Sequence, residues 1–264
     1  MLLKIEDLDV SFRSDEGDVV RAAVDVDLSL DRGEVLGLVG ESGSGKSSVA
    51  MSVARLLPSP PAFYPKGRIL FDGEDVLSLP LPALRRIRGR RIGVVFQDPM
   101  GSLSPLHRIG DQLVETIRLH EDMSRKAAEA MALEWLGKVG LPEPAVRARA
   151  YPHELSGGMQ QRVMIAMGLM LGPDLVIADE PTTALDVTIQ AQVLKPMKAL
   201  HRANSAVLLI THDLGVVSQM ATKLAVMKAG RVVETAADPE AFFRNPQHPY
   251  SRALVGEAKK MEVE

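Results

Sequence analysis

Residues 40–47 decide the fold; they read Gly-Glu-Ser-Gly-Ser-Gly-Lys-Ser and lie between the apolar run 35–39 and a helix predicted over 46–57. The glycines allow a tight backbone turn, so that successive N–H groups can point at one anion near the positive end of that helix. Lys46 adds a positive charge for the β- and γ-phosphates, and Ser47 adds a hydroxyl ligand for Mg²⁺. We therefore predict that this stretch, called the phosphate loop below, binds a nucleotide. A plain Gly-Ser surface loop is the alternative.

Two further features complete the predicted nucleotide contacts at this end of the chain. Ser48 follows closely enough to reach the α-phosphate. Phe12, on a predicted strand, offers a flat face for adenine, and a core phenylalanine is its alternative reading. The residues predicted to contact nucleotide here are Phe12, Gly40, Glu41, Ser42, Gly43, Ser44, Gly45, Lys46, Ser47 and Ser48.

Composition narrows the class of protein. The 264 residues are 46% apolar, enough for one elaborated domain or two small lobes. A net charge of −3 gives no overall basic field, which disfavours a nucleic-acid partner. No cysteine is present, which excludes disulfides, thiol catalysis and cysteine-ligated metal sites. The longest apolar run, 163–172, is well short of the roughly 20 residues of a membrane-spanning helix, so we expect a cytoplasmic protein that reaches a membrane only through a partner.

Patterning divides the chain into a β-rich and a helical part. Alternating apolar residues over 2–39 predict a β lobe, whereas helix-spaced apolar residues over 109–150 predict a helical insertion. Short helices are predicted from Pro239 and near the C-terminus. The five arginines of 85–91 read as a solvated face with local ion pairs.

Two apolar runs that predict buried strands are each followed by an uncharged or weakly basic polar residue. Run 92–96 precedes Gln97, and run 207–210 precedes His212 by one residue. Because ligands of open α/β sheets bind at the carboxyl ends of strands, Gln97 is expected near Mg²⁺ and the γ-phosphate. His212 is expected to donate a hydrogen bond to the γ-phosphate. An exposed glutamine and an unremarkable loop histidine are the alternatives.

A third buried run, 175–178, ends in two adjacent carboxylates. Asp179 fits the group that holds Mg²⁺, and Glu180 fits the base that polarises the attacking water. Such neighbours repel, which a metal ion relieves. A helix-capping acidic cluster is the alternative.

A second anion-receptive helix start is predicted at 155–158, which reads Leu-Ser-Gly-Gly. Ser156 stands at the capping position, followed by Gly157 and Gly158. Because the phosphate loop already holds its own nucleotide, we expect this segment to contact nucleotide bound to another subunit. A purely structural helix cap is the alternative.

The phosphate loop, Gln97, residues 155–158, the Asp-Glu pair and His212 occur in an order and spacing that resemble the ATP-binding-cassette family. The resemblance implies the ATPase subunit of an ABC transporter with an α/β fold: a P-loop NTPase cassette with a RecA-like core, an N-terminal antiparallel β lobe and an inserted α-helical subdomain. It implies one domain over 1–264. The implied parts are a β lobe and core at 1–108 and 172–235, a helical subdomain at 109–171 and a helical tail at 236–264.

The resemblance also implies that two copies pair head to tail around ATP and Mg²⁺. Each ATP would then lie between one subunit's phosphate loop and the other's Ser156, Gly157 and Gly158, with Asp186 communicating across the seam. The implied catalytic residues are Lys46, Gln97, Glu180 and His212, and the implied metal-binding residues are Ser47, Gln97 and Asp179. Implied partners are two transmembrane permease subunits, a second ATPase subunit, identical or paralogous, and indirectly an extracytoplasmic solute-binding protein. No nucleic acid is implied, and the chain would sit on the cytoplasmic face of the inner membrane.

Finer motifs are similar to the peptide/nickel importer subfamily. They include Phe-Gln-Asp-Pro-Met at 96–100, Ser-Leu-Ser-Pro at 102–105 and Asn-Pro-Gln-His-Pro-Tyr at 245–250. Many members continue into a cysteine-containing region that this sequence lacks, which removes any iron–sulfur site. The alternatives are a soluble, non-transport cassette ATPase and a slowly hydrolysing regulatory protein.

Overall fold

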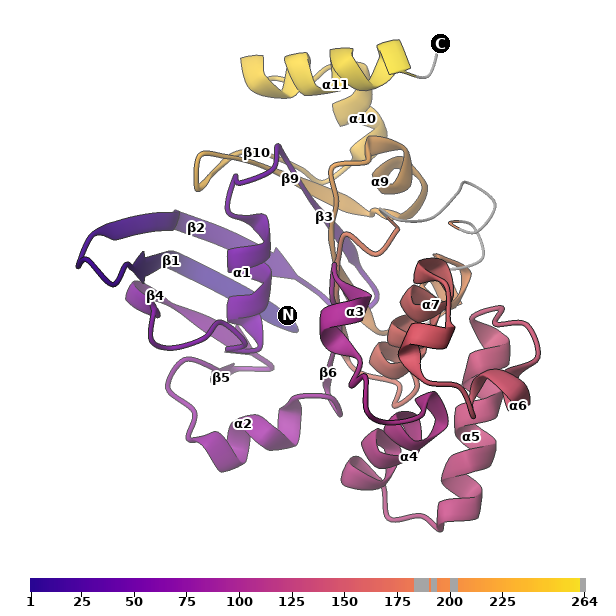
Figure 1. Ribbon diagram of the computed structural model, residues 1–264. Coiled ribbons are helices and arrows are strands. Elements are labelled where there is room, and N and C mark those ends of the chain that lie inside the picture. The colour runs from indigo at the N-terminus through magenta and orange to yellow at the C-terminus, as the bar shows by residue number, and fades with distance from the viewer. Residues whose placement is uncertain (183–189, 191–193, 200–203, 262–264) are drawn as a thin grey trace. The chain divides into compact units, whose positions relative to one another are not determined.

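The computed structural model describes residues 1–182, 190, 194–199 and 204–261 (Figure 1). The chain divides into two compact units, each described here by itself. Unit 1 comprises Met1–Leu84 and Ala206–Glu264, and unit 2 comprises Arg85–Ser205. The boundary falls within helix α2 (Leu81–Ile87). The domain limits expected from the sequence remain a prediction.

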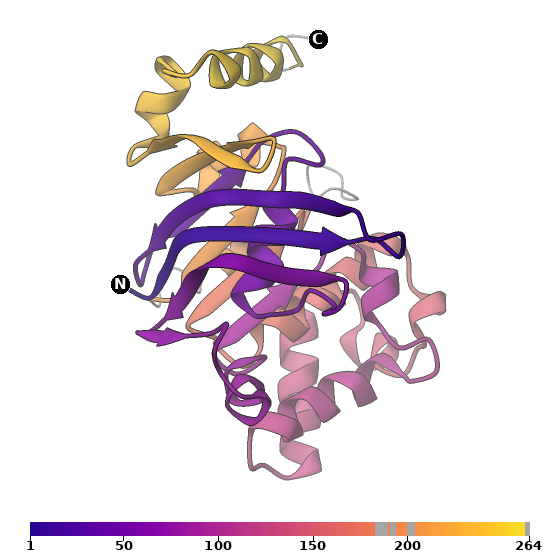
Figure 2. The same cartoon turned by 90° about the vertical axis from the view of Figure 1, so that its left-hand side faces the viewer.

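Unit 1 begins with the antiparallel sheet that the N-terminal alternation predicts. Its strand order is β2-β1-β4-β5, and its strands are β1 (Leu3–Arg13), β2 (Val19–Leu30), β4 (Ala62–Phe71) and β5 (Glu74–Asp75) (Figure 2). Leu3 pairs with Leu30 on one side and Phe71 on the other, and all three are buried. This apolar ladder fixes the register, because a one-residue slip would expose every core side chain.

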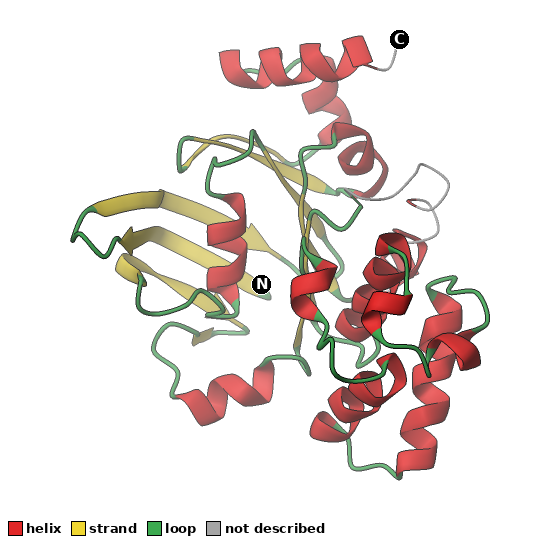
Figure 3. Cartoon of the chain, viewed as in Figure 1, coloured by secondary structure: helices red, strands yellow, loops and turns green. Residues whose placement is uncertain are grey.

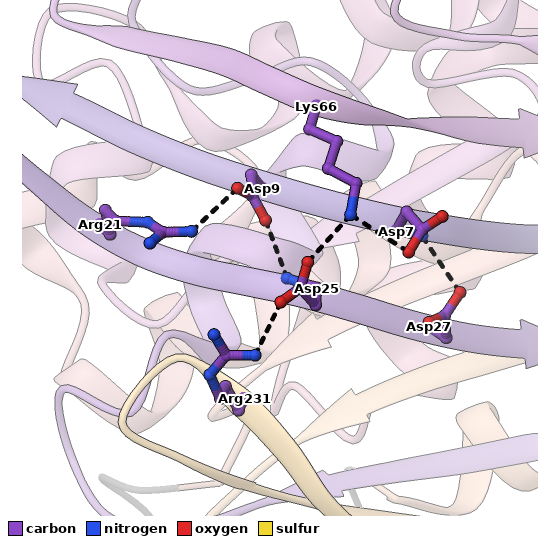
Figure 4. A network of polar contacts seen from close by, with 7 residues as sticks. All are labelled: Asp7, Asp9, Arg21, Asp25, Asp27, Lys66 and Arg231. Atoms are coloured by element: carbon purple, nitrogen blue, oxygen red, sulfur yellow. Dashed lines mark hydrogen bonds and ion pairs between the residues drawn. The ribbon is translucent and has the colours of Figure 1, made fainter.

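A network of charged residues joins this sheet to Arg231, the first residue of strand β10 (Arg231–Ala236). Its members are Asp7, Asp9, Arg21, Asp25, Asp27, Lys66 and Arg231 (Figure 4). Asp25 lies 3.0 Å from Lys66 Nζ and 2.8 Å from an Arg231 nitrogen, and hydrogen bonds from Arg231 and Lys66 lower the pKa of Asp25. Exposed pairs of this kind stabilise a fold weakly. Asp9 differs because it is buried and also accepts the backbone N–H of Asp25 at 2.8 Å.

Unit 1 also contains the strands that carry the phosphate loop. Their order is β10-β9-β3-β8, and they span β3 (Val35–Val39), β8 (Ala206–Ile210), β9 (Lys223–Lys228) and β10 (Arg231–Ala236). β3 is parallel to both β8 and β9, and β10 is antiparallel to β9. Every residue of β3 and β8 is buried, as continuous apolar runs in a parallel sheet require.

Four helices accompany these strands: α1 (Lys46–Val53), α9 (Leu214–Met220), α10 (Pro239–Arg244) and α11 (Pro249–Met261). The sequence predicts that α1 runs to Leu57, but it ends at Val53 because Arg55 adopts a left-handed conformation with φ of 48°. α10 and α11 are not a detached tail. Phe242 and Tyr250 from these helices share one buried cluster with Val39 at the end of β3.

Unit 2 is mainly helical (Figure 3) and contains a parallel strand pair. The strands are β6 (Ile92–Val95) and β7 (Leu175–Asp179). Its helices include α3 (Pro99–Ser102), α4 (Ile109–His120), α5 (Arg125–Lys138), α6 (Pro144–Arg147), the 3₁₀ helix η1 (Pro152–Glu154) and α7 (Gly157–Leu169). Within the described residues, no helix has both the length and the apolar character needed to cross a bilayer.

The arginine-rich segment 85–91 makes local ion pairs within unit 2. Arg90 Nε lies 3.0 Å from Glu121, and Arg91 Nε lies 2.6 Å from Asp174. Arg90 also donates to the carbonyl of Leu171 at 2.8 Å. These contacts agree with the ion-paired face that the charge pattern predicts.

Candidate nucleotide-binding site

The phosphate loop connects β3 to α1, and its glycines are required by geometry. Gly40 and Gly45 have φ of 148° and 99°, values that side-chain-bearing residues rarely adopt. A Cβ on Gly40 would lie 2.1 Å from the carbonyl oxygen of Met227, and one on Gly45 would lie 2.1 Å from that of Ala22. The backbones of β9 and β2 therefore lie too close to the loop at these two points to leave room for a side chain.

Lys46 lies at the centre of the loop. It is only 6% exposed, and its Nζ donates to the carbonyl oxygens of Gly40 at 2.8 Å and Glu41 at 2.7 Å. Burying an ammonium group requires such partners, and the loop itself supplies them. The first turn of α1 contains no acidic residue, so the helix dipole and the lysine both favour an anion.

His212 leaves the sheet at the same edge as the phosphate loop. β3 and β8 are parallel with Leu38 opposite Ile210, so Gly40 and His212 each follow the last aligned pair by two residues. The His212 side chain is exposed. The backbone after it is fixed because Asp213 caps α9, accepting the N–H of Gly215 at 2.8 Å. The structure thus brings two of the predicted nucleotide-contacting groups to one edge of unit 1.

Phe12 is half-buried on β1 and pairs with Val20 of β2. Val20 is 62% exposed, and paired residues share one face of a sheet, so the two side chains form an apolar surface. Ala22, two residues further along β2, is the residue whose carbonyl approaches Gly45. Phe12 is therefore neither a core phenylalanine nor remote from the loop. Its stacking on adenine remains a prediction.

In unit 2, the other catalytic candidates gather at the carboxyl ends of β6 and β7. The strands are parallel with Val95 opposite Ala178, so Gln97 and Glu180 each follow this pair by two residues. Gln97 is exposed, and Asp179 is 5% exposed. Glu180 has φ of 48°, a left-handed conformation that costs about 1–3 kcal/mol for a residue with a side chain and that clusters at functional sites.

Ser156 caps helix α7 as the sequence predicts. Its hydroxyl accepts the N–H of Met159 at 3.4 Å, and the first turn of α7 contains no acidic residue. A Cβ on Gly157 would meet no atom within 4 Å, so the backbone at this helix start stands open to an approaching group. These features suit the binding of an anion.

Two buried glutamines lie next to this helix start, and neither is among the site residues predicted from the sequence. Gln160 donates to the carbonyl oxygens of Pro152 at 2.8 Å and Leu155 at 3.2 Å. Gln161 donates to that of Pro181 at 3.0 Å, which ties α7 to the residue after Glu180. The only signal in the sequence is a pair of amides in an otherwise apolar helix, and it does not say which carbonyls they bind.

Each unit by itself supplies an oxygen donor of the kind that Mg²⁺ binds. Mg²⁺ in nucleotide sites takes most ligands from phosphates and water and one or two from side chains. Asp179 supplies a buried strand-end carboxylate, and Ser47 supplies an exposed hydroxyl in the first turn of α1. Across the described ranges no three His, Asp or Glu side chains group as an all-protein metal cage. Asp186, expected at the subunit seam, lies outside the described residues.

A glycine loop between a buried parallel strand and a helix, wrapped around a lysine, defines a P-loop nucleotide-binding protein. The family model for ABC transporters matches residues 23–183. The chain is 47% identical over 262 residues to the oligopeptide transport ATP-binding protein OppD of Bacillus subtilis (strain 168), covering 99% of this chain and 73% of that protein. It is 46% identical to the dipeptide transport ATP-binding protein DppD of the same organism, covering 99% of this chain and 78% of that protein.

Two further comparisons agree. The peptidoglycan transport ATP-binding protein YejF of Agrobacterium fabrum (strain C58 / ATCC 33970) is 51% identical over 99% of this chain, which spans 48% of that protein. A solved dimeric structure of the ATP-binding cassette MJ0796, in a post-hydrolysis state bound to ADP and Pi, is 28% identical with a TM-score of 0.81 and covers 89% of this chain and 99% of that one. The chain belongs to the ABC transporter family and has its P-loop cassette fold. It is an ATP-binding subunit that hydrolyses ATP.

Proposed function

We propose that this chain powers a peptide importer from the cytoplasmic face of the membrane. Its partners would be two permease subunits, a second ATPase subunit, identical or paralogous, and indirectly an extracytoplasmic solute-binding protein. The observation that carries the cargo assignment is the likeness along 99% of the chain to proteins named for oligopeptide and dipeptide transport. Import of nickel, the other cargo of the subfamily that the sequence resembles, is tested against peptide import below.

We propose that the residues divide the chemistry as follows. The phosphate loop and Lys46 bind the β- and γ-phosphates, while Ser47, Gln97 and Asp179 hold Mg²⁺, which neutralises phosphate charge. Glu180 orients the attacking water and accepts its proton. His212 donates a hydrogen bond to the γ-phosphate and so distinguishes ATP from ADP.

The start of α7 is proposed to act on nucleotide held by the other ATPase subunit. Support comes from its open, capped N-terminus and from the dimeric state of the MJ0796 cassette. ATP would then favour the closed dimer because it binds both halves of each site, and loss of the γ-phosphate would favour opening. Closure moves the permease only through the difference in ATP affinity between the two states.

The test is cargo uptake in cells that carry either the wild-type chain or Lys46→Ala in place of the chromosomal copy. We expect uptake of a labelled tripeptide with the wild type and none with the variant, and co-purification of the wild type with permease subunits. Uptake of ⁶³Ni²⁺ without peptide would overturn the cargo assignment. Purification without any permease would favour a soluble cassette ATPase.

A further inference from the structure

We propose that Tyr250 of α11 is a positioning residue for ATP, because its hydroxyl fixes the orientation of the Gly40–Glu41 peptide in the phosphate loop. The inference rests on the proposed role of this loop as the phosphate site. It assigns a role in nucleotide affinity to the C-terminal helix, whose sequence contains no phosphate-binding motif.

The contact involves both edges of a single peptide unit. The N–H of Glu41 donates to the Tyr250 hydroxyl at 2.9 Å. The carbonyl of Gly40, which belongs to the same peptide, accepts from Lys46 Nζ at 2.8 Å. Gly40 has no side chain to restrict rotation about this peptide, and its φ of 148° lies far from helical values. The two hydrogen bonds therefore supply the restraint that glycine lacks.

The Tyr250 ring is itself held firmly. Tyr250 is 7% exposed and packs in the cluster that contains Val39, the residue immediately before the loop, and Val255 of its own helix. Lys228 Nζ lies 4.5 Å from the ring centroid, in cation–π range. This packing restricts the ring, so the hydroxyl has a defined position next to the Glu41 N–H.

The start of α11 is fixed by β10. Both oxygens of the Glu234 carboxylate are used, because the N–H groups of Gln247 and His248 each donate to it at 2.8 Å. His248 Nδ1 accepts the N–H of Tyr250 at 3.2 Å. A continuous set of contacts therefore runs from β10 through the entry to α11 and Tyr250 to the peptide beside Lys46.

Loss of the hydroxyl should weaken ATP binding without changing the chemical step. A loop that samples several peptide orientations binds ATP in only a fraction of them, and the apparent affinity falls by that fraction. A net hydrogen-bond contribution of ordinary size corresponds to a rise of about 2- to 12-fold in Kd. Lys46, Glu180 and His212 keep their identities, so kcat at saturating ATP should stay unchanged.

The test compares Tyr250→Phe, which keeps the ring, with Leu254→Ala, which removes packing from the same helix and cluster. Binding of Mg–AMP-PNP to the purified chain is measured by calorimetry, and KM and kcat are measured for ATP. We expect Tyr250→Phe to raise Kd and KM about 2- to 12-fold with unchanged kcat, and to speed amide exchange at Glu41. Leu254→Ala should leave Kd within about twofold.

Wild-type affinity in Tyr250→Phe would overturn the inference, as would an equal loss of affinity in Leu254→Ala, since packing alone would then explain the effect. Lys46→Ala separates this result from failure of the proposed function. If AMP-PNP binds to Lys46→Ala as tightly as to the wild type, or does not bind to the wild type at all, the proposed phosphate site itself is wrong.

Discussion

Replacing Gly45 by alanine measures how strongly β2 confines the phosphate loop, and Gly43→Ala is the matched control. Both glycines have positive φ, 99° and 77°, so each substitution carries the cost of a left-handed alanine, about 1–2 kcal/mol. Only at Gly45 would the new Cβ overlap backbone, 2.1 Å from the Ala22 carbonyl oxygen, whereas at Gly43 no atom lies within 4 Å. Overpacking adds about 1–3 kcal/mol, so we expect Gly45→Ala to lose about 2–5 kcal/mol in total.

The assay is urea unfolding of the nucleotide-free chain followed by far-ultraviolet circular dichroism. We expect a lower urea midpoint for Gly45→Ala than for Gly43→Ala, with a difference of about 1–3 kcal/mol in unfolding free energy. Nucleotide is left out because bound phosphate could stabilise the Gly45→Ala and Gly43→Ala variants by different amounts and so obscure the comparison of their unfolding free energies. Equal midpoints for the two variants would refute the argument that the β2 backbone confines the loop.

Three other predictions follow from the geometry. Ser156→Ala and Ser124→Ala each remove a serine N-cap and should each lower the free energy of unfolding by about 1 kcal/mol. Only Ser156→Ala should also lower ATPase activity, by roughly tenfold or more. Equal activity in the two variants would contradict the proposed phosphate contact of Ser156. In urea unfolding, Asp9→Ala should lose about 1–3 kcal/mol of unfolding free energy because it leaves the backbone N–H of Asp25 in β2 without its acceptor. Asp27 is exposed, so Asp27→Ala should change the unfolding free energy by less than about 0.5 kcal/mol. A larger loss in Asp27→Ala than in Asp9→Ala would be inconsistent with the burial of Asp9. Burial opposes ionisation of Glu234, but the Ser251 side chain and the backbone N–H groups of Gln247 and His248 leave its pKa below the ordinary 4.5. The stabilisation from Glu234 is therefore present above about pH 4.5 and is lost as pH falls through the lower, folded-state pKa. The stability difference between wild type and Glu234→Gln should therefore shrink below that pH in thermal unfolding, and a constant difference from pH 3 to 7 would argue against this role.

The glycine-lysine loop and the strand-end polar residues could be predicted because local sequence determines them. A glycine pattern between an apolar strand and a helix leaves few conformations for residues 40–47. Parallel strands then bring their carboxyl ends to one edge, which is why His212 lies beside the loop in unit 1 and Gln97 beside Glu180 in unit 2.

Contacts between distant parts of the chain could not be predicted in the same way. Tyr250 and Glu41 are 209 positions apart, and nothing in either local sequence indicates that a hydroxyl meets a backbone N–H. The buried amides of Gln160 and Gln161 depend equally on which carbonyls the fold brings near them. The early end of α1 reflects the left-handed Arg55, a backbone state that helix propensity does not reveal.

We propose that ATP hydrolysis by this chain depends on Glu180 as the base. The most direct test is steady-state Mg²⁺-ATPase activity of the chain purified with its membrane partners, compared between wild type and Glu180→Gln, with bound ATP measured in both. We expect Glu180→Gln to lose activity by about 100-fold or more while it still binds ATP. Turnover near the wild-type rate in Glu180→Gln would contradict the assignment of Glu180 as the base.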